Sequence, residues 1–314
     1  MNGFKIVVDE GGDLPQDYQN KNQIEKMIPM KYTINGIDYT GYNDPNRMTL
    51  GEFYQTLRKR QKIRINQVGI SLRAFREAFE PLAQDGNDIL YITFSSNLYF
   101  NHICDDANMV AIDLMEAYPG VTIRVVDSLQ VSLGTGLLVH YAVELRKQGK
   151  TLEETAMILE REKQHILSYF AINDLHFVKR VGRISEMAAV VGSMLRIKPI
   201  LQINQEGDLI AIGKAHGRKQ VLRKLVKKMK QKINSQRNQV VFIAHGDCSK
   251  AANDVAELVK KKLNMECFLI HIIGVSTASR LGAGAVALFF WGDSRLEEQN
   301  SHSNPKLWYH DQYR

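Results

Sequence analysis

The sequence predicts an α/β protein with two domains. Three short apolar runs, at 4–8, 88–94 and 121–126, each end in polar residues and lead through a turn towards a later helix. This alternation is typical of a parallel sheet with right-handed crossovers, and we expect a three-layer first domain over residues 1–150. Hairpin and helix signals alternate over residues 151–292, which predicts a mixed sheet with helices. At 314 residues and 44% hydrophobic composition, the chain is long enough for both domains.

The first domain also contains a hairpin signal. Asn35 and Gly36 separate the apolar segments 28–34 and 37–39, and this dipeptide favours a tight turn between two strands. Residues 63–70 show no clear periodicity, and we expect a loop there.

Hydroxyl side chains follow one of the predicted parallel strands. Ser95 and Ser96 come directly after strand 88–94. Ligands of open α/β sheets bind beyond the carboxyl ends of the strands, so these hydroxyls could hold a polar head group. Their commoner use is to cap the following helix.

The second domain should contain a hairpin, two helices and a Gly-rich turn. Residues 204–207 mark the hairpin, and residues 275–285 form the turn, which contains Arg280. Residues 293–314 are polar, and we expect a peripheral or disordered tail. The remaining predicted strands are 168–172, 197–203, 209–212, 240–244, 267–273 and 285–290.

An uncharged helix is predicted at 187–195, after a Gly-Arg corner. A helix that is apolar all round is either buried or lines an apolar cavity. Arg183 stands near its start, where backbone N–H groups favour an anion, so this corner could bind a carboxylate or phosphate. Pairing of Arg183 with a local acidic residue is the alternative.

The net charge of +7 is concentrated over residues 214–237, and no acidic residue occurs between Lys214 and Gly246. Most such runs are solvated faces of amphipathic helices. The alternative is an acidic protein or an anionic membrane surface. We expect no nucleic-acid partner, because the interleaved aromatic residues that stack bases are missing.

The sequence lacks the motifs that several classes of function require. The sequence contains no GxGxxG, GxxxxGK[ST], GxSxG or HExxH motif, none of its nine histidines is at metal-ligand spacing to another, and its three cysteines are far apart. We therefore expect no metal, no cofactor and no enzymatic activity. The first ten residues include Asp9 and Glu10 and do not resemble a signal peptide, which predicts a cytoplasmic protein.

Several short segments, taken together, resemble the DegV family of bacterial fatty-acid-binding proteins over about residues 3 to 292. The segment that runs from Gly182-Arg183-Ile184-Ser185 to Ile197-Lys198-Pro199-Ile200 aligns without a gap. The other matching segments are Asp9, Asp13-Leu14-Pro15, Ile28-Pro29-Met30, Ser95-Ser96-Asn97-Leu98, Val126-Asp127-Ser128 with Gly134 and Gly136, Lys214 with Gly217-Arg218, and Gly282-Ala283-Gly284.

The resemblance implies a protein that holds one long-chain fatty acid. The tail would lie in an apolar tunnel of the second domain, and the carboxylate in a cleft between the domains. The protein would present this ligand to a partner fatty-acid kinase for acyl-phosphate formation.

The chain departs from the family pattern at the expected head-group site. The family's Thr-Ser-Gln is replaced around Asn66 and Gln67, its head-group Ser by Tyr99, its His-Thr around Ser279 and Arg280, and a common Arg by His216. Arg280 could compensate through a charge-assisted bond to the carboxylate. Alternatively, the site is vestigial or binds another apolar anion, and the protein acts in interaction or regulation. The candidate ligand-binding residues are Asn66, Gln67, Ser95, Ser96, Tyr99, Arg183, His216, Ser279, Arg280 and Gly282.

Overall fold

The first domain contains a parallel four-stranded sheet, as the sequence predicts. The computed structural model describes residues 3–41, 48–59, 64–97, 102–173, 197–234, 240–265 and 268–297. The strand order in the first sheet is β2-β1-β6-β7, and all neighbouring pairs are parallel. Its strands are β1 (Lys5–Asp9), β2 (Ile24–Ile28), β6 (Ile89–Thr93) and β7 (Ile123–Asp127).

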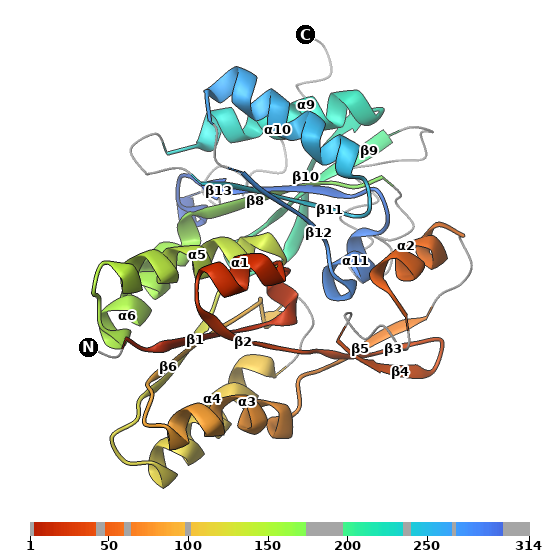
Figure 1. The fold of residues 1–314 in the computed structure, drawn as a ribbon. Coiled ribbons are helices and arrows are strands. Elements are labelled where there is room, and N and C mark those ends of the chain that lie inside the picture. The colour runs from red at the N-terminus through yellow and green to blue at the C-terminus, as the bar shows by residue number, and fades with distance from the viewer. Residues whose placement is uncertain are drawn as a thin grey trace.

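Helices cover both faces of this sheet (Figure 1). Helices α3 and α4 cover one face, and α1, α5 and α6 lie between this sheet and the second one. The arrangement confirms the predicted three-layer first domain. The helices are α1 (Gln16–Lys21), α3 (Leu72–Gln84), α4 (Ile103–Ala117), α5 (Leu133–Lys147) and α6 (Leu152–Glu162).

Helix α5 joins the two domains into one core. Its first turns consist of small and aliphatic residues and are fully buried between the sheets. A Cβ atom added at Gly134 would lie 2.9 Å from the Phe289 ring of the second domain, so this close approach requires glycine. The two domains therefore pack directly on one shared helix.

The second sheet is mixed and has the strand order β10-β9-β8-β13-β11-β12. Only β11 and β12 are parallel, and β13 pairs antiparallel with both β8 and β11. Helices α9 (Arg218–Lys232) and α10 (Ser249–Leu263) cover its outer face (Figure 1). Its strands are β8 (Ile166–Ala171), β9 (Ile197–Ile203), β10 (Leu209–His216), β11 (Val241–His245), β12 (Phe268–Ile272) and β13 (Val286–Trp291).

A third, small sheet corrects two predictions. The predicted strand 28–34 is divided between β2 and β3 (Lys31–Ile34), which belong to different sheets. The predicted hairpin between β3 and β4 (Ile37–Thr40) is present. The predicted loop 63–70 is wrong, because β5 (Ile65–Gly69) pairs antiparallel with β3. Helix α2 (Leu50–Arg58) lies between β4 and β5 in the sequence.

Two predictions in the second domain are also wrong. The segment expected to be a Gly-rich turn begins with helix α11 (Val275–Leu281). The described start of the polar tail is not peripheral, because Arg295 in the 3-10 turn Arg295–Glu297 is only 2% exposed. No helix among the described segments is long and apolar enough to span a bilayer. The predicted helix 187–195 lies outside the described residues.

Candidate ligand-binding site

The carboxyl ends of β1, β6 and β7 meet at the edge of the first sheet that faces the second domain. Asp9 at the end of β1 is fully buried. Its carboxylate accepts bonds from the Tyr91 hydroxyl at 2.9 Å, the Gly11 N–H at 2.9 Å and the Phe94 N–H at 3.0 Å. Burial raises the pKa of Asp9 to about 6. This carboxyl group fixes the turns after two neighbouring strands.

Both candidate serines at the end of β6 donate their hydroxyl protons to protein acceptors. Ser95 Oγ donates to the Gly207 carbonyl at 3.1 Å, and Ser96 Oγ donates to Asp127 Oδ2 at 2.5 Å. Gly207 lies in the turn between β9 and β10, so Ser95 links the two domains. A bound carboxylate would therefore have to displace Gly207 before Ser95 could donate to it.

A second link between the domains is formed by Asp13, which is fully buried. Its carboxyl oxygens accept bonds from the Gly274 N–H at 3.0 Å and from the Ser132 hydroxyl at 2.5 Å. Burial raises the pKa of Asp13 to about 8 in spite of these donors. The Tyr54 hydroxyl of α2 donates to the Ile273 carbonyl at 2.7 Å beside it. The start of α11 is thus held by two bonds from the first domain.

Helix α11 carries three of the candidate residues. It lies between the second sheet and α2 (Figure 1). Ser279 is buried and donates its hydroxyl proton to the Ser276 carbonyl at 2.7 Å. Arg280 is half-buried near the end of the helix, and Gly282 is the C-cap residue. Of these three residues, Arg280 supplies the positive charge that would attract a carboxylate.

The end of α11 packs closely on two other segments. The Gly284 N–H donates to the Gly246 carbonyl at 2.6 Å. A Cβ atom at Gly284 would lie 3.1 Å from Asn173, the last described residue after β8. Lys198 at the start of β9 donates to the Asn173 carbonyl at 2.5 Å. Arg280 therefore belongs to a helix whose end contacts the boundary of segment 174–196.

The other described candidates lie on the third sheet and at an edge of the second sheet. Asn66 is exposed on β5 opposite Thr33, and the backbone of Gln67 pairs with Tyr32. His216 is exposed at the end of β10, which is an edge strand of the second sheet. The side chain of Gln67, together with Tyr99 and Arg183, lies outside the described part of the chain.

Sequence reasoning did not identify the residues that join the domains. The candidate ligand-binding residues of the sequence do not include Asp13, Tyr54 and Gln130. Gln130 is buried, donates to the Ile166 carbonyl at 2.9 Å, and accepts a short bond from the Ser168 hydroxyl. A buried amide bonded to a strand of the other domain gives no periodic signal in the sequence. Asp13 occurred only as part of a matching segment.

The described residues contain no group of three or more His, Cys, Asp or Glu side chains that could hold a metal ion. The acidic residues at the interface instead accept hydrogen bonds from backbone N–H and hydroxyl groups. The described residues of this region join the two domains at the start of α11, and Arg280 places one positive charge on this helix.

Comparison with known proteins gives one consistent result. The family model described as "Uncharacterised protein, DegV family" matches residues 3–293. A DegV domain-containing protein of Clostridium perfringens is 37% identical over 300 residues, which cover 94% of this chain and 99% of that protein.

Solved structures share the fold. A DegV family protein from Thermus thermophilus, described by its fatty-acid binding, has a TM-score of 0.78 and 25% identity, with 93% of this chain and 100% of that chain covered. A stearic acid-binding protein from Eubacterium ventriosum has a TM-score of 0.81 and 21% identity, with 94% and 99% covered.

Proposed function

The chain belongs to the DegV family, and from this membership we propose that it binds one long-chain fatty acid. The main observation that supports this proposal is the match of the DegV family model along nearly the whole chain. The fold is also shared with relatives that are described as fatty-acid-binding proteins. The protein acts as a carrier and not as a catalyst in this proposal. The fatty acid is its only ligand, and no further cofactor takes part.

We place the carboxylate at the interface between the domains, near α11. Arg280 is the proposed cationic partner because it is half-buried on this helix and can form a charge-assisted bond. Ser95, Ser96 and Ser279 donate to protein acceptors, so their proposed role is to position the walls of the site. Gly282 ends the helix, and Asn66, Gln67, Tyr99, Arg183 and His216 remain proposed contributors.

The proposed carrier presents its ligand to a fatty-acid kinase, which forms the acyl phosphate. Resemblance to the family supports this step. The second candidate function is an interaction or regulatory protein with a vestigial site, or a protein that binds another apolar anion. The hydroxyls of Ser95 and Ser279 favour this alternative, because both donate to backbone carbonyls.

Native mass spectrometry of gently purified protein tests the proposal. We expect a mass increment equal to one acyl chain, and uptake of oleate or palmitate by protein stripped of lipid. If no acyl chain co-purifies and neither fatty acid is taken up, the carrier function is rejected and the alternative is favoured.

Substitution of Arg280 tests the position of the carboxylate. Loss of a buried charged partner typically costs about 2–5 kcal/mol, so Arg280→Ala should weaken fatty-acid affinity by at least about tenfold. Arg223→Ala, an exposed arginine on α9, is the matched control and should bind like the parent. Equal affinity of Arg280→Ala and the parent would show that the carboxylate is bound elsewhere.

A further inference from the structure

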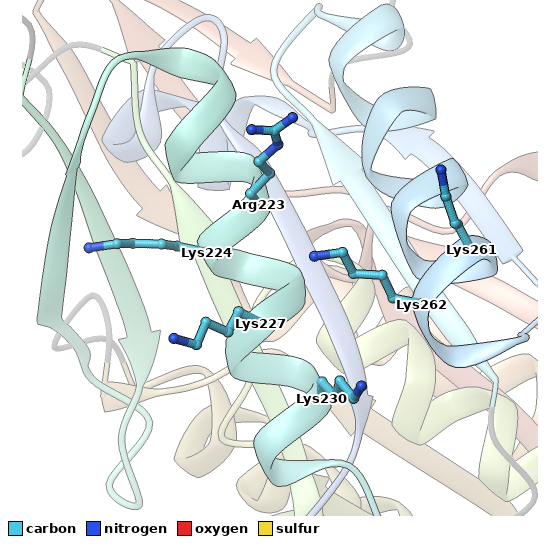
Figure 2. A pocket seen from close by; sticks show the side chains of 6 residues that line it. All are labelled: Arg223, Lys224, Lys227, Lys230, Lys261 and Lys262. Carbon is cyan, nitrogen blue, oxygen red and sulfur yellow. The ribbon is translucent and has the colours of Figure 1, made fainter.

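Helices α9 and α10 form a groove of about 510 Å³ on the outer face of the second sheet, and every described residue that lines it is basic. Lys262 extends from α10 towards α9, and Arg223 and Lys230 lie on the side of α9 that faces it (Figure 2). The described residues that line the groove are Arg223, Lys224, Lys227, Lys230, Lys261 and Lys262.

None of these six charges is paired in a salt bridge within the described part of the chain. Lys224 donates to the Lys214 carbonyl at 2.8 Å, which leaves its charge uncompensated. Among the described residues, no salt bridge involves Arg223, Lys227, Lys230, Lys261 or Lys262. Like charges on adjacent helix faces destabilise the protein slightly, and an anionic partner would remove that repulsion.

A second section of about 610 Å³ continues the groove through Arg223 and Lys261. Leu222, Ala251 and Leu258 contribute apolar surface there. Of the described residues that line this section, only Asp254 and Glu257 are acidic, and both lie on α10. Arg218, Lys219 and Lys250 also line this section, so the groove stays mainly basic and includes a small apolar surface between α9 and α10.

We propose that this groove binds an acidic, amphipathic helical segment of a partner protein. Amphipathic helices bind in grooves through an apolar face, and here the partly exposed Ala251 and Leu258 would contact it. Glu or Asp side chains of the partner would lie against the lysines of α9 and α10. The site is separate from the proposed fatty-acid site, because it lies on the outer face of the second sheet (Figure 1).

The composition of the groove favours a protein over a membrane or nucleic acid. Interfacial helices insert large apolar side chains into the lipid, and none of the exposed large apolar residues in the described chain belongs to α9 or α10. The described lining of both sections contains no aromatic residue on which bases could stack.

Fluorescence anisotropy with a labelled amphipathic peptide tests this assignment. The probe is a helical peptide of about five turns, with Glu on one face and Leu and Ala on the other. The variant K227Q/K230Q/K262Q removes three charges from the groove. The control K21Q/K26Q/K31Q removes three charges from exposed lysines of the first domain. Fatty-acid uptake is measured for both variants.

We expect the groove variant to bind the probe about tenfold more weakly and the control variant to remain within about twofold of the parent. Unchanged fatty-acid uptake by both variants would show that the two sites are independent. Equal weakening by both variants would mean non-specific attraction and overturn the proposal. Tighter, groove-dependent binding to phosphatidylglycerol vesicles or to duplex DNA at the same ionic strength would also overturn it.

Discussion

Asp13 is a buried carboxyl group that joins α11 to the first domain, and its protonation should affect stability. Its pKa is raised from 3.8 to about 8 in the folded protein. Between these values the folded state binds a proton that the unfolded state has lost, so the free energy of unfolding falls as pH rises. The slope from this residue is at most about 1.4 kcal/mol per pH unit, and it ends above about pH 8.

Asp13→Asn should remove this pH dependence. Asn accepts the left-handed backbone of residue 13, at φ 49°, and cannot ionise. We expect the variant to show a flatter profile between about pH 6 and 8, above the pKa of Asp9, and higher stability than the parent at about pH 8. Urea unfolding at several pH values measures both. The exposed control Asp85→Asn should keep the parent slope, and an unchanged slope in Asp13→Asn would contradict the prediction.

Individual site residues were only partly predictable from the sequence. The sequence predicts hydroxyl groups directly after strand 88–94, and in the structure Ser95 bonds to the second domain while Ser96 bonds to Asp127 of its own domain. The acceptor of Ser95 is Gly207, which is 112 positions away, and no local pattern encodes that bond. The role of Asp13 depends on Gly274, 261 positions away, for the same reason. Tertiary partners of this kind decide which side chains can still contact a ligand.

At the scale of the elements, local signals succeeded where strands are buried and failed where tertiary contacts define the element. Strands β1, β6 and β7 are continuous apolar runs, and all were predicted. Strand β5 is not predicted, because its sequence has no clear periodicity and only its pairing with β3 defines it as a strand. Helix α11 was missed because it has seven residues, lacks a side-chain cap, and ends before two glycines. Its start is fixed by Asp13 of another domain.

The turn after β11 supports the end of α11 and should not tolerate a larger residue. A Cβ atom at Gly246 would lie 2.7 Å from the Gly282 carbonyl oxygen and 3.1 Å from the Ala285 nitrogen, and both are backbone atoms. Gly246→Ala should therefore lower the free energy of unfolding by about 1–3 kcal/mol. Gly213→Ala in β10 is the matched control, because no atom lies within 4 Å of its added Cβ. Urea midpoints compare the two, and equal midpoints would refute the steric argument.

At the scale of the whole molecule, Arg295 connects segments from both domains. Its guanidinium donates to the carbonyls of Leu129 at 3.1 Å, Asn204 at 2.6 Å and Lys163 at 3.0 Å. Arg295→Ala should lower the free energy of unfolding by about 3 kcal/mol or more, because three acceptors lose a charged donor. Thermal and urea unfolding measure this loss.

The matched control for Arg295 is Arg73→Ala. Arg73 is 88% exposed and pairs with Glu77 on the surface of α3, so its removal should change stability by no more than about 0.5 kcal/mol. Similar stability of the two variants would show that the three bonds of Arg295 contribute little.

Arg295 also follows every described strand of the three sheets in the order of synthesis. A ribosome produces its three acceptors first, and domains generally fold as units while translation proceeds. During elongation Arg295 is therefore still missing when its three acceptors, the carbonyls of Leu129, Lys163 and Asn204, have been synthesised. In a nascent chain that ends before residue 295, both domains could fold, but they would lack the three hydrogen bonds that Arg295 donates.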